Sequence, residues 1–346
     1  VLMGVCAFVL GLADLWTRLR LPSGTRPSAG SARGELLEPR SPRSTSDTGR
    51  DDSRQGRADA LDTVTLGAYG ALCLVGLAVA VMLAGGRGIR AAQAVFLALA
   101  VWGLVRAGMR APQLWRWGKS ASGTDLARTA AFAAAACCSI WFWTDVFRDH
   151  IALPGAYDGI VHTAYYLRVL EAGVPTLGRV SIGFASIFGK QMFEFYPTGT
   201  HSLMAITSGF WGQWGLVSHA GILKAWFTLA MAAAPFSLFW VARRLTARMP
   251  WWVGLALIFV AMPGFRFPIE AAHEGGASRL VTHVLMAPIY ADVVLGRFQD
   301  SRRRLLAGIL LGLAFLMHPS AFVTLAALVA YATAFGIKED EGWRRR

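Results

Sequence analysis

The amino-acid sequence predicts an all-α polytopic membrane protein. Hydrophobic residues make up 55% of the 346-residue chain and charged residues only 16%, whereas about a quarter of the residues in a soluble domain are charged. Several continuous runs of roughly 17–22 apolar residues are long enough to cross a bilayer core of ~30 Å as helices. These runs are rich in Ala, Leu and Gly and do not alternate with polar residues, which argues against membrane-spanning strands.

The first part of the chain precedes the predicted helix bundle. We interpret residues 1–17 as a truncated membrane span, because the segment is apolar apart from Asp14 and Thr17. A signal peptide is the alternative, although no basic segment precedes the apolar run. Residues 18–60 hold nine arginines and almost no large apolar side chains. We therefore expect a disordered, basic linker on the cytoplasmic side of the membrane.

The membrane spans are expected within residues 61–147 and 213–336. The apolar runs place them near residues 64–84, 92–108, 128–146, 220–241, 250–266 and 279–296. A hairpin of two shorter helices follows, near residues 304–317 and 320–336, because Pro319 lacks a backbone donor and ends the first helix at His318. Residues 337–346 are expected to form a charged cytoplasmic tail.

The arginines predict the orientation of this bundle. With the linker inside, the connectors on its side of the membrane hold 25 of the 34 basic residues, as the positive-inside rule requires. The net charge of +13 is thus explained by membrane topology, and nucleic acid is not the expected partner. Residues 148–212 then form a long extracytoplasmic loop that contains helices and the candidate site. All seven histidines fall at or near this outer face.

The predicted outer face combines carboxylates, imidazoles and cations over an apolar bundle. Such a mixture suits chemistry at a membrane surface, with a carboxylate as base and cations for a phosphate leaving group. The candidate residues are Asp158, His162, Lys190, His201, Arg266, Glu270, His273, Glu274, Arg279 and His318.

Asp158 and His162 are the catalytic candidates, and each has a structural alternative. Asp158 precedes an amphipathic stretch that ends at Gly173, so its side chain could cap a helix N-terminus instead of acting as a base. His162 follows four residues later and lies on the same helix face. An isolated Asp/His pair at this spacing is also typical of an ordinary helix surface.

The remaining candidates would bind substrate. His201 begins an apolar helix, where free N–H groups could face a phosphate, or it lies in the membrane interface. Arg266 and Arg279 could hold a lipid-linked phosphate or pair with lipid headgroups. His318 could point into a central cavity or cap the carbonyl groups of the preceding helix.

Glu270, His273 and Glu274 have residue types that are common among metal ligands. They lack the HExxH helix signature of zinc proteases, so we consider a second carboxylate, an acceptor-binding role or a solvated loop. The four cysteines show no metal-binding spacing such as CxxC.

Three features together resemble the GT-C superfamily of polyprenyl-phosphate-sugar glycosyltransferases, over roughly residues 128–336. They are a single Asp158 near the start of a long outer loop, the turn Tyr196-Pro197-Thr198-Gly199-Thr200-His201 before a helix, and the glycine-rich run LLAGILLGLAFLMHPSAF from Leu305 to Phe322. The resemblance includes protein O-mannosyltransferases and arabinofuranosyltransferases, and is nearest to uncharacterised bacterial membrane proteins of that type.

The resemblance implies an inverting glycosyltransferase with a GT-C-like helix bundle in the bacterial cytoplasmic membrane. Asp158 would be the general base on the acceptor hydroxyl, with Tyr196, Lys190 and the other candidates around the sugar and phosphate of the donor. The paired acidic motif that is frequent in that family is absent, since Gly159 and Ile160 follow Asp158. The requirement for a divalent metal therefore stays an open question. The expected partners are the lipid-linked sugar and membrane lipid.

Two other functions are compatible with the sequence. A transporter or flippase of a lipid-linked or small polar substrate would need ionisable groups inside the membrane, for which Asp14, Lys224 and Asp292 are the candidates. A non-catalytic relative is the third alternative.

Overall fold

The structure is a computed structural model, and it describes residues 8, 11–12, 48–146, 158–175, 197–213, 218–245, 250–264, 277–295 and 301–335. All regular structure in these residues is helical. The helices, in chain order, are α2 (Thr48–Leu83), α3 (Gly88–Ser120), α4 (Gly123–Val146), α5 (Asp158–Ala172), α7 (Gly199–Gln213), α8 (His219–Leu245), α9 (Trp251–Gly264), α11 (Ala277–Val294), α12 (Ser301–Met317) and α13 (Pro319–Phe335).

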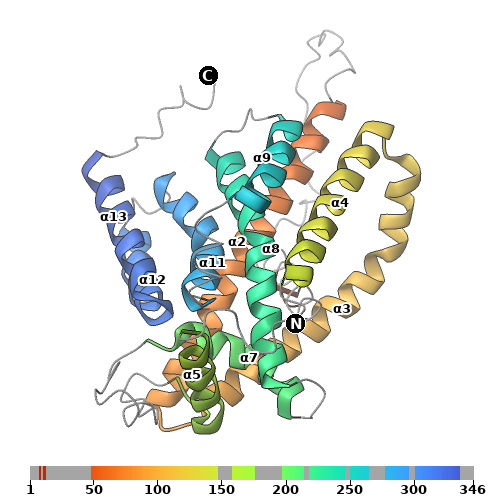
Figure 1. Cartoon of the computed structure of the whole chain (residues 1–346). Coiled ribbons are helices and arrows are strands. Elements are labelled where there is room, and N and C mark those ends of the chain that lie inside the picture. Colours follow the sequence, from red (N-terminus) through yellow and green to blue (C-terminus); the bar gives the residue numbers. More distant parts are fainter. Residues whose placement is uncertain are drawn as a thin grey trace, which may run out of the picture.

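The long helices form a bundle in which α2, α8 and α11 lie between two outer helix pairs (Figure 1). The pair α3 and α4 lies on one side of these three helices, and the hairpin of α12 and α13 lies on the other. The core between α2, α8 and α11 consists of fully buried apolar side chains, among them Val75, Phe227, Met231, Met286 and Ile289. Large continuous apolar faces explain this packing, because each helix buries one side against its neighbours.

Among the described residues, four helical segments are long and apolar enough to cross a membrane. They are Thr65–Leu83, Gly88–Pro112, Gly123–Asp145 and His219–Ala242, and they confirm the expectation of an all-helical membrane protein. α12 and α13 supply two shorter apolar segments. The predicted span at residues 250–266 corresponds to α9, which has 14 residues and reaches only about 21 Å.

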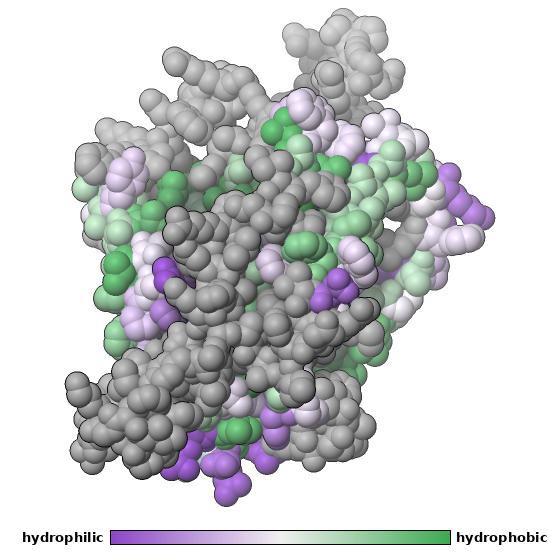
Figure 2. Space-filling model, in the orientation of Figure 1, coloured by the Kyte–Doolittle hydropathy of each residue, from purple (hydrophilic) through white to green (hydrophobic). Residues whose placement is uncertain are grey.

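The outward surfaces of α3 and α4 are apolar and exposed. Val101, Met109 and Trp141 are each more than half exposed, and Figure 2 shows hydrophobic residues over this side of the molecule. Hydrophilic residues gather at the lower edge in the same view. This pattern fits a lipid-facing surface with polar ends.

The predicted linker is wrong at its C-terminal end. We expected residues 18–60 to be disordered, but α2 begins at Thr48 and continues without interruption to Leu83. Alanine and arginine are good helix formers, so the segment Arg54 to Ala60 extends the membrane helix although it cannot form a core of its own. Most of residues 1–47, and residues 336–346, lie outside the described part of the chain.

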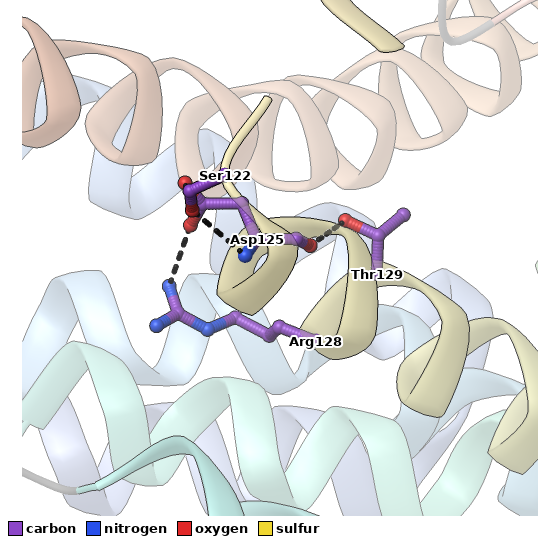
Figure 3. Close-up of polar contacts among 4 residues, drawn as sticks. All are labelled: Ser122, Asp125, Arg128 and Thr129. Carbon is purple, nitrogen blue, oxygen red and sulfur yellow. Dashed lines mark hydrogen bonds and ion pairs between the residues drawn. The ribbon is translucent and has the colours of Figure 1, made fainter. Parts of the chain in front are cut away.

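The N-terminus of α4 is fixed by a capping box (Figure 3). The backbone N–H of Asp125 donates to the hydroxyl of Ser122 at 3.2 Å, and that hydroxyl donates to Asp125 Oδ2 at 2.8 Å. Arg128 lies 3.7 Å from the other carboxylate oxygen, and Thr129 donates to the carbonyl of Asp125 at 2.8 Å. Side chains that bond the free N–H groups of a first turn stabilise helix initiation.

α5, α7 and the α12–α13 connection lie at the end of the bundle opposite to the α3–α4 connection (Figure 1). We call this the α5–α7 end. α9 and the C-terminus of α8 lie at the other end, as does the C-terminal part of α3 with Arg110, Arg116 and Lys119.

Candidate functional site

Helix α5 carries His162 into the α5–α7 end. It begins at Asp158, as the sequence predicts, and stops where Gly173 takes a positive φ of 69°. The backbone N–H of Ile89 at the start of α3 donates to the carbonyl of Gly173 at 2.9 Å. His162 is 7% exposed. The side chain of Asp158 lies outside the described residues, so its roles as base or cap stay predictions.

Helix α7 begins at Gly199, two residues before His201. A Cβ atom on Gly199 would lie 2.5 Å from the carbonyl oxygen of Leu316, near the end of α12. Only glycine allows this close approach of two backbones. The next residue, Thr200, donates to the carbonyl of Met317 at 2.9 Å and lies 2.7 Å from the Thr282 hydroxyl on α11. The first turn of α7 is thereby fixed to α11 and α12.

His162 and His201 bond each other directly. Nδ1 of His162 lies 3.0 Å from Nε2 of His201, and the two rings stack with centroids 5.1 Å apart. Nε2 of His162 lies 3.3 Å from the Ser278 hydroxyl in the first turn of α11. Both nitrogens of His162 thus have a hydrogen-bond partner, which fixes the orientation of its ring.

Both imidazoles are neutral at physiological pH. Burial lowers the pKa of His162 to about 4. Burial also lowers the pKa of His201 well below its ordinary value, and repulsion from His162 and His318 acts in the same direction. A neutral imidazole can accept a proton or a hydrogen bond as well as donate one.

His318 lies between α12 and α13 and caps α13. Its Nδ1 accepts the backbone N–H of Ser320 at 3.2 Å and lies 2.7 Å from the hydroxyl of the same serine. The prediction that α12 ends at His318 is confirmed, and the imidazole caps the helix that follows. Pro319 has no N–H, so the first free donor of α13 is that of Ser320, and the imidazole bonds this group.

The Ser320 hydroxyl also connects His318 to α11. It lies 2.9 Å from Nε2 of His283, whose Nδ1 lies 3.1 Å from the hydroxyl of Tyr290. We call His162, His201, His283 and His318 the histidine cluster. Burial lowers the pKa values of His201 and His318, and repulsion between members of the cluster acts in the same direction.

Arg279 brings a cation to the same end of the bundle. It follows Ser278 in α11, and its side chain is exposed. Burial lowers the pKa of His318 to about 4, and His283, His162 and Arg279 add to this effect. The guanidinium is therefore near the histidine cluster and accessible to an anion.

The structure thus brings together four of the residues that the sequence predicts, namely His162, His201, Arg279 and His318. It leaves Lys190, Tyr196, Arg266, Glu270, His273 and Glu274 outside the described residues, so their roles stay predictions.

Sequence reasoning missed the hydroxyl groups of the site and His283. Ser278, Thr282, His283 and Tyr290 all lie on α11, which we interpreted as an ordinary span. Their spacing was a usable signal, because residues four and seven positions apart share one face of a helix. A polar stripe of this kind in an apolar helix marks the side that faces other protein segments.

The described residues contain no group of three or more His, Cys, Asp or Glu side chains arranged to hold a metal. In the histidine cluster the rings bond each other or serine and tyrosine hydroxyls.

The fold and site define an all-helical membrane protein with a buried, hydrogen-bonded histidine cluster at one end of its bundle. Comparison of the chain with protein-family models, with curated proteins and with solved structures found no match.

Proposed function

We propose that this chain is an integral-membrane glycosyltransferase of the GT-C type, which transfers a sugar from a polyprenyl-phosphate donor to an acceptor hydroxyl. The observation that carries the proposal is the buried contact of His162 with His201 and Ser278 at the α5–α7 end. Ionisable groups buried in a membrane bundle are costly for folding, and they generally mark functional sites.

The proposed reaction is a direct displacement. The acceptor oxygen bonds to the anomeric carbon of the sugar as its proton passes to the carboxylate of Asp158. The bond from that carbon to the phosphate oxygen breaks, and the polyprenyl phosphate leaves with the electron pair. Attack from the face opposite the phosphate inverts the anomeric configuration.

The described residues support this role in two ways. His162 has a neutral ring that His201 and Ser278 hold in place, so we assign it the positioning of the first turns of α5, which also carry Asp158 four residues earlier. Arg279 is exposed beside the cluster, and a guanidinium pairs well with phosphate oxygens. His201 is fully buried, so we assign it the orientation of His162 in place of direct phosphate binding.

We further propose that the protein lies in the bacterial cytoplasmic membrane with the α5–α7 end on the extracytoplasmic side. The C-terminal part of α3, which holds Arg110, Arg116 and Lys119, lies at the opposite end (Figure 1). The positive-inside rule assigns such basic segments to the cytoplasm.

The experiment uses purified protein in lipid and a panel of radiolabelled polyprenyl-phosphate sugars, with and without a divalent metal. Wild type should consume one donor, and Asp158→Ala should not. Asp125→Asn is the matched control, because this carboxylate lies in the α4 capping box at the far end of the bundle. Equal consumption by wild type and Asp158→Ala would contradict the base role.

A transporter or flippase is the second candidate, and Asp292 is the observation that favours it. Its carboxylate is 5% exposed within α11, and the hydroxyl of Tyr69 on α2 lies 3.4 Å from its Oδ2 atom. Buried carboxylates in membrane bundles frequently belong to ion or proton pathways. Saturable donor binding without consumption, together with loss of donor translocation in Asp292→Asn, would favour this function.

A further inference from the structure

The C-terminal half of α3 presents its side chains to the surroundings of the bundle. In the first half of the helix a buried stripe, which includes Phe96 and Ala100, packs against α2 and α7. Gly103 is the last buried position among the described side chains of α3. The next helix, α4, packs against α8 and α9, and Trp115 is 69% exposed. The membrane and its surface are therefore the immediate environment of the last turns of α3.

The length of α3 brings its C-terminal end to the level of the lipid headgroups. The helix has 33 residues, which corresponds to about 50 Å, whereas the hydrocarbon core of a bilayer is about 30 Å thick. The segment that is apolar enough to span the membrane ends at Pro112. Residues 113–120 add about 12 Å and thus reach beyond the hydrocarbon core into the layer that contains the lipid phosphates.

This end of α3 carries positive charge only. Arg110, Arg116 and Lys119 are exposed there, and the helix contains no Asp or Glu. The next carboxylate along the chain, Asp125, lies 3.7 Å from Arg128 in the capping box of α4. Helices that face water generally combine both signs, because pairs of opposite charge one turn apart stabilise them. A helix end with cations alone is instead complementary to an anionic surface.

Two tryptophans lie beside cations of α3. The Lys119 ammonium lies 5.2 Å from the ring centroid of Trp115, one turn earlier. Nearer the centre of the membrane, Cζ of Arg106 lies 6.0 Å from the ring centroid of Trp102, with the same spacing of four residues. Such contacts are attractive, and indole rings favour the bilayer interface. An ammonium over one face of a ring keeps N–H groups for a phosphate oxygen, so Trp115 holds Lys119 at the depth where it can bind one.

We propose that Trp115, Arg116 and Lys119 form a binding surface for the headgroups of anionic phospholipids, and we call these residues the α3 cationic end. The surface continues into the exposed apolar side of α3, where Val105 is more than half exposed and acyl chains would lie. This continuity favours a lipid over a soluble anion. A zwitterionic lipid has the same phosphate but also a cation, so it should bind less tightly. The inference does not depend on the proposed sugar transfer.

The test compares phosphatidylglycerol with phosphatidylcholine as ligands of the full chain in a neutral detergent. Native mass spectrometry would measure the dissociation constant of the first bound lipid. We expect wild type to bind phosphatidylglycerol more tightly. In Arg116→Gln/Lys119→Gln this affinity should fall about fivefold for each cation removed, while the affinity for phosphatidylcholine should change little. Trp115→Leu should also weaken phosphatidylglycerol binding, because Lys119 loses the ring that holds it.

Arg87→Gln/Arg90→Gln is the matched control. It removes two exposed cations at the opposite end of the same helix and changes the net charge by the same amount, so it should bind phosphatidylglycerol as wild type does. Thermal unfolding of both double variants should match wild type, because the replaced side chains are exposed.

Three results would overturn the inference. One is equal affinity of wild type for the two lipids, and another is an equal loss of phosphatidylglycerol affinity in the two double variants, which would indicate an effect of net charge alone. The third is tighter binding of a single-stranded oligonucleotide than of phosphatidylglycerol, since the α3 cationic end would then recognise a nucleic acid.

Discussion

Nδ1 of His162 and Nε2 of His201 lie 3.0 Å apart, although 39 positions separate the two residues in the chain. Only one hydrogen fits between two ring nitrogens at this distance, so one ring donates and the other accepts. The accepting ring must be neutral at that nitrogen. The contact joins α5 to α7 and makes the geometry of the α5–α7 end dependent on the protonation state of both rings.

We predict that acid destabilises the protein through this pair. The pKa of His162 is about 4 in the folded protein and 6.5 in an unperturbed histidine. Between these values the unfolded chain binds more protons, so the free energy of unfolding falls as pH decreases from about 6.5 to about 4. His162 alone would account for about 3 kcal/mol. The measurement is denaturant unfolding, followed by tryptophan fluorescence, at neutral pH and at about pH 4.

The control for this prediction compares two histidine substitutions. His162→Gln removes a histidine whose pKa is lowered on folding, so it should reduce the difference in stability between neutral and acidic pH. His219→Gln replaces a histidine at the start of α8, outside the cluster, and serves as the reference substitution. An unchanged difference in His162→Gln would show that other groups cause the acid sensitivity.

We predict that Gly199→Ala destabilises the α5–α7 end. A Cβ at this position would lie 2.5 Å from the Leu316 carbonyl oxygen and 2.9 Å from the backbone nitrogen of Met317. Backbone atoms cannot move away as a flexible side chain would, so the helices must separate, at a cost of about 1–3 kcal/mol. Thermal unfolding in detergent would measure this loss.

Gly308→Ala is the matched substitution for Gly199→Ala. Gly308 lies within α12, and nothing lies within 4 Å of the position of its Cβ. Alanine favours helix formation relative to glycine, so Gly308→Ala should be neutral or slightly stabilising. If both substitutions lowered the melting temperature equally, the close approach of α7 and α12 would not be the cause.

The helices could be predicted from sequence because their signals are local. The ends of α5 follow from Asp158 and Gly173, and the break between α12 and α13 follows from Pro319, whose missing N–H acts within one turn. The start of α2 at Thr48 was missed. The polar composition of the segment shows that it cannot form a hydrophobic core, but a polar segment can still be helical when it extends an apolar helix.

The site could be predicted only in part, because its contacts join distant segments. His162 and Ser278 are 116 positions apart, and Thr200 and Met317 are 117 apart. Sequence gives the face of a helix on which a side chain lies, but the packing angle and register between two helices come from the shape of many apolar side chains. The histidines were therefore identifiable as candidates, while their hydroxyl partners were not.

We predict that Thr200→Val weakens the attachment of α7. The substitution removes the hydrogen bonds of the Thr200 hydroxyl to the carbonyl of Met317 and to Thr282, and it leaves buried polar groups with fewer partners. The expected loss of stability is about 1–2 kcal/mol. Thr200→Ser keeps the hydroxyl and should be closer to wild type when thermal unfolding of both variants is compared.

Thr333→Val provides a surface reference for Thr200→Val. Thr333 is exposed on α13, and its hydroxyl donates only within its own helix, to Val329 at 2.7 Å. This substitution should change stability by less than about 0.5 kcal/mol. An effect of Thr200→Val as small as that of Thr333→Val would mean that α7 does not depend on these hydrogen bonds.

We predict that Ser122→Ala opens the first turn of α4 without affecting the histidine cluster. It removes the side-chain cap on the Asp125 N–H and one of the two partners of the Asp125 carboxylate, which should cost about 1 kcal/mol locally. Hydrogen exchange of the first amide groups of α4 would therefore become faster. Ser120→Ala is the control, because the Ser120 hydroxyl donates to the Arg116 carbonyl one turn earlier in α3. Since α4 begins at the end of the bundle opposite to α5 and α7 (Figure 1), the ¹⁵N signals of His162 and His201 should stay unchanged in both variants. A shift of these signals in Ser122→Ala would reveal coupling between the two ends of the bundle.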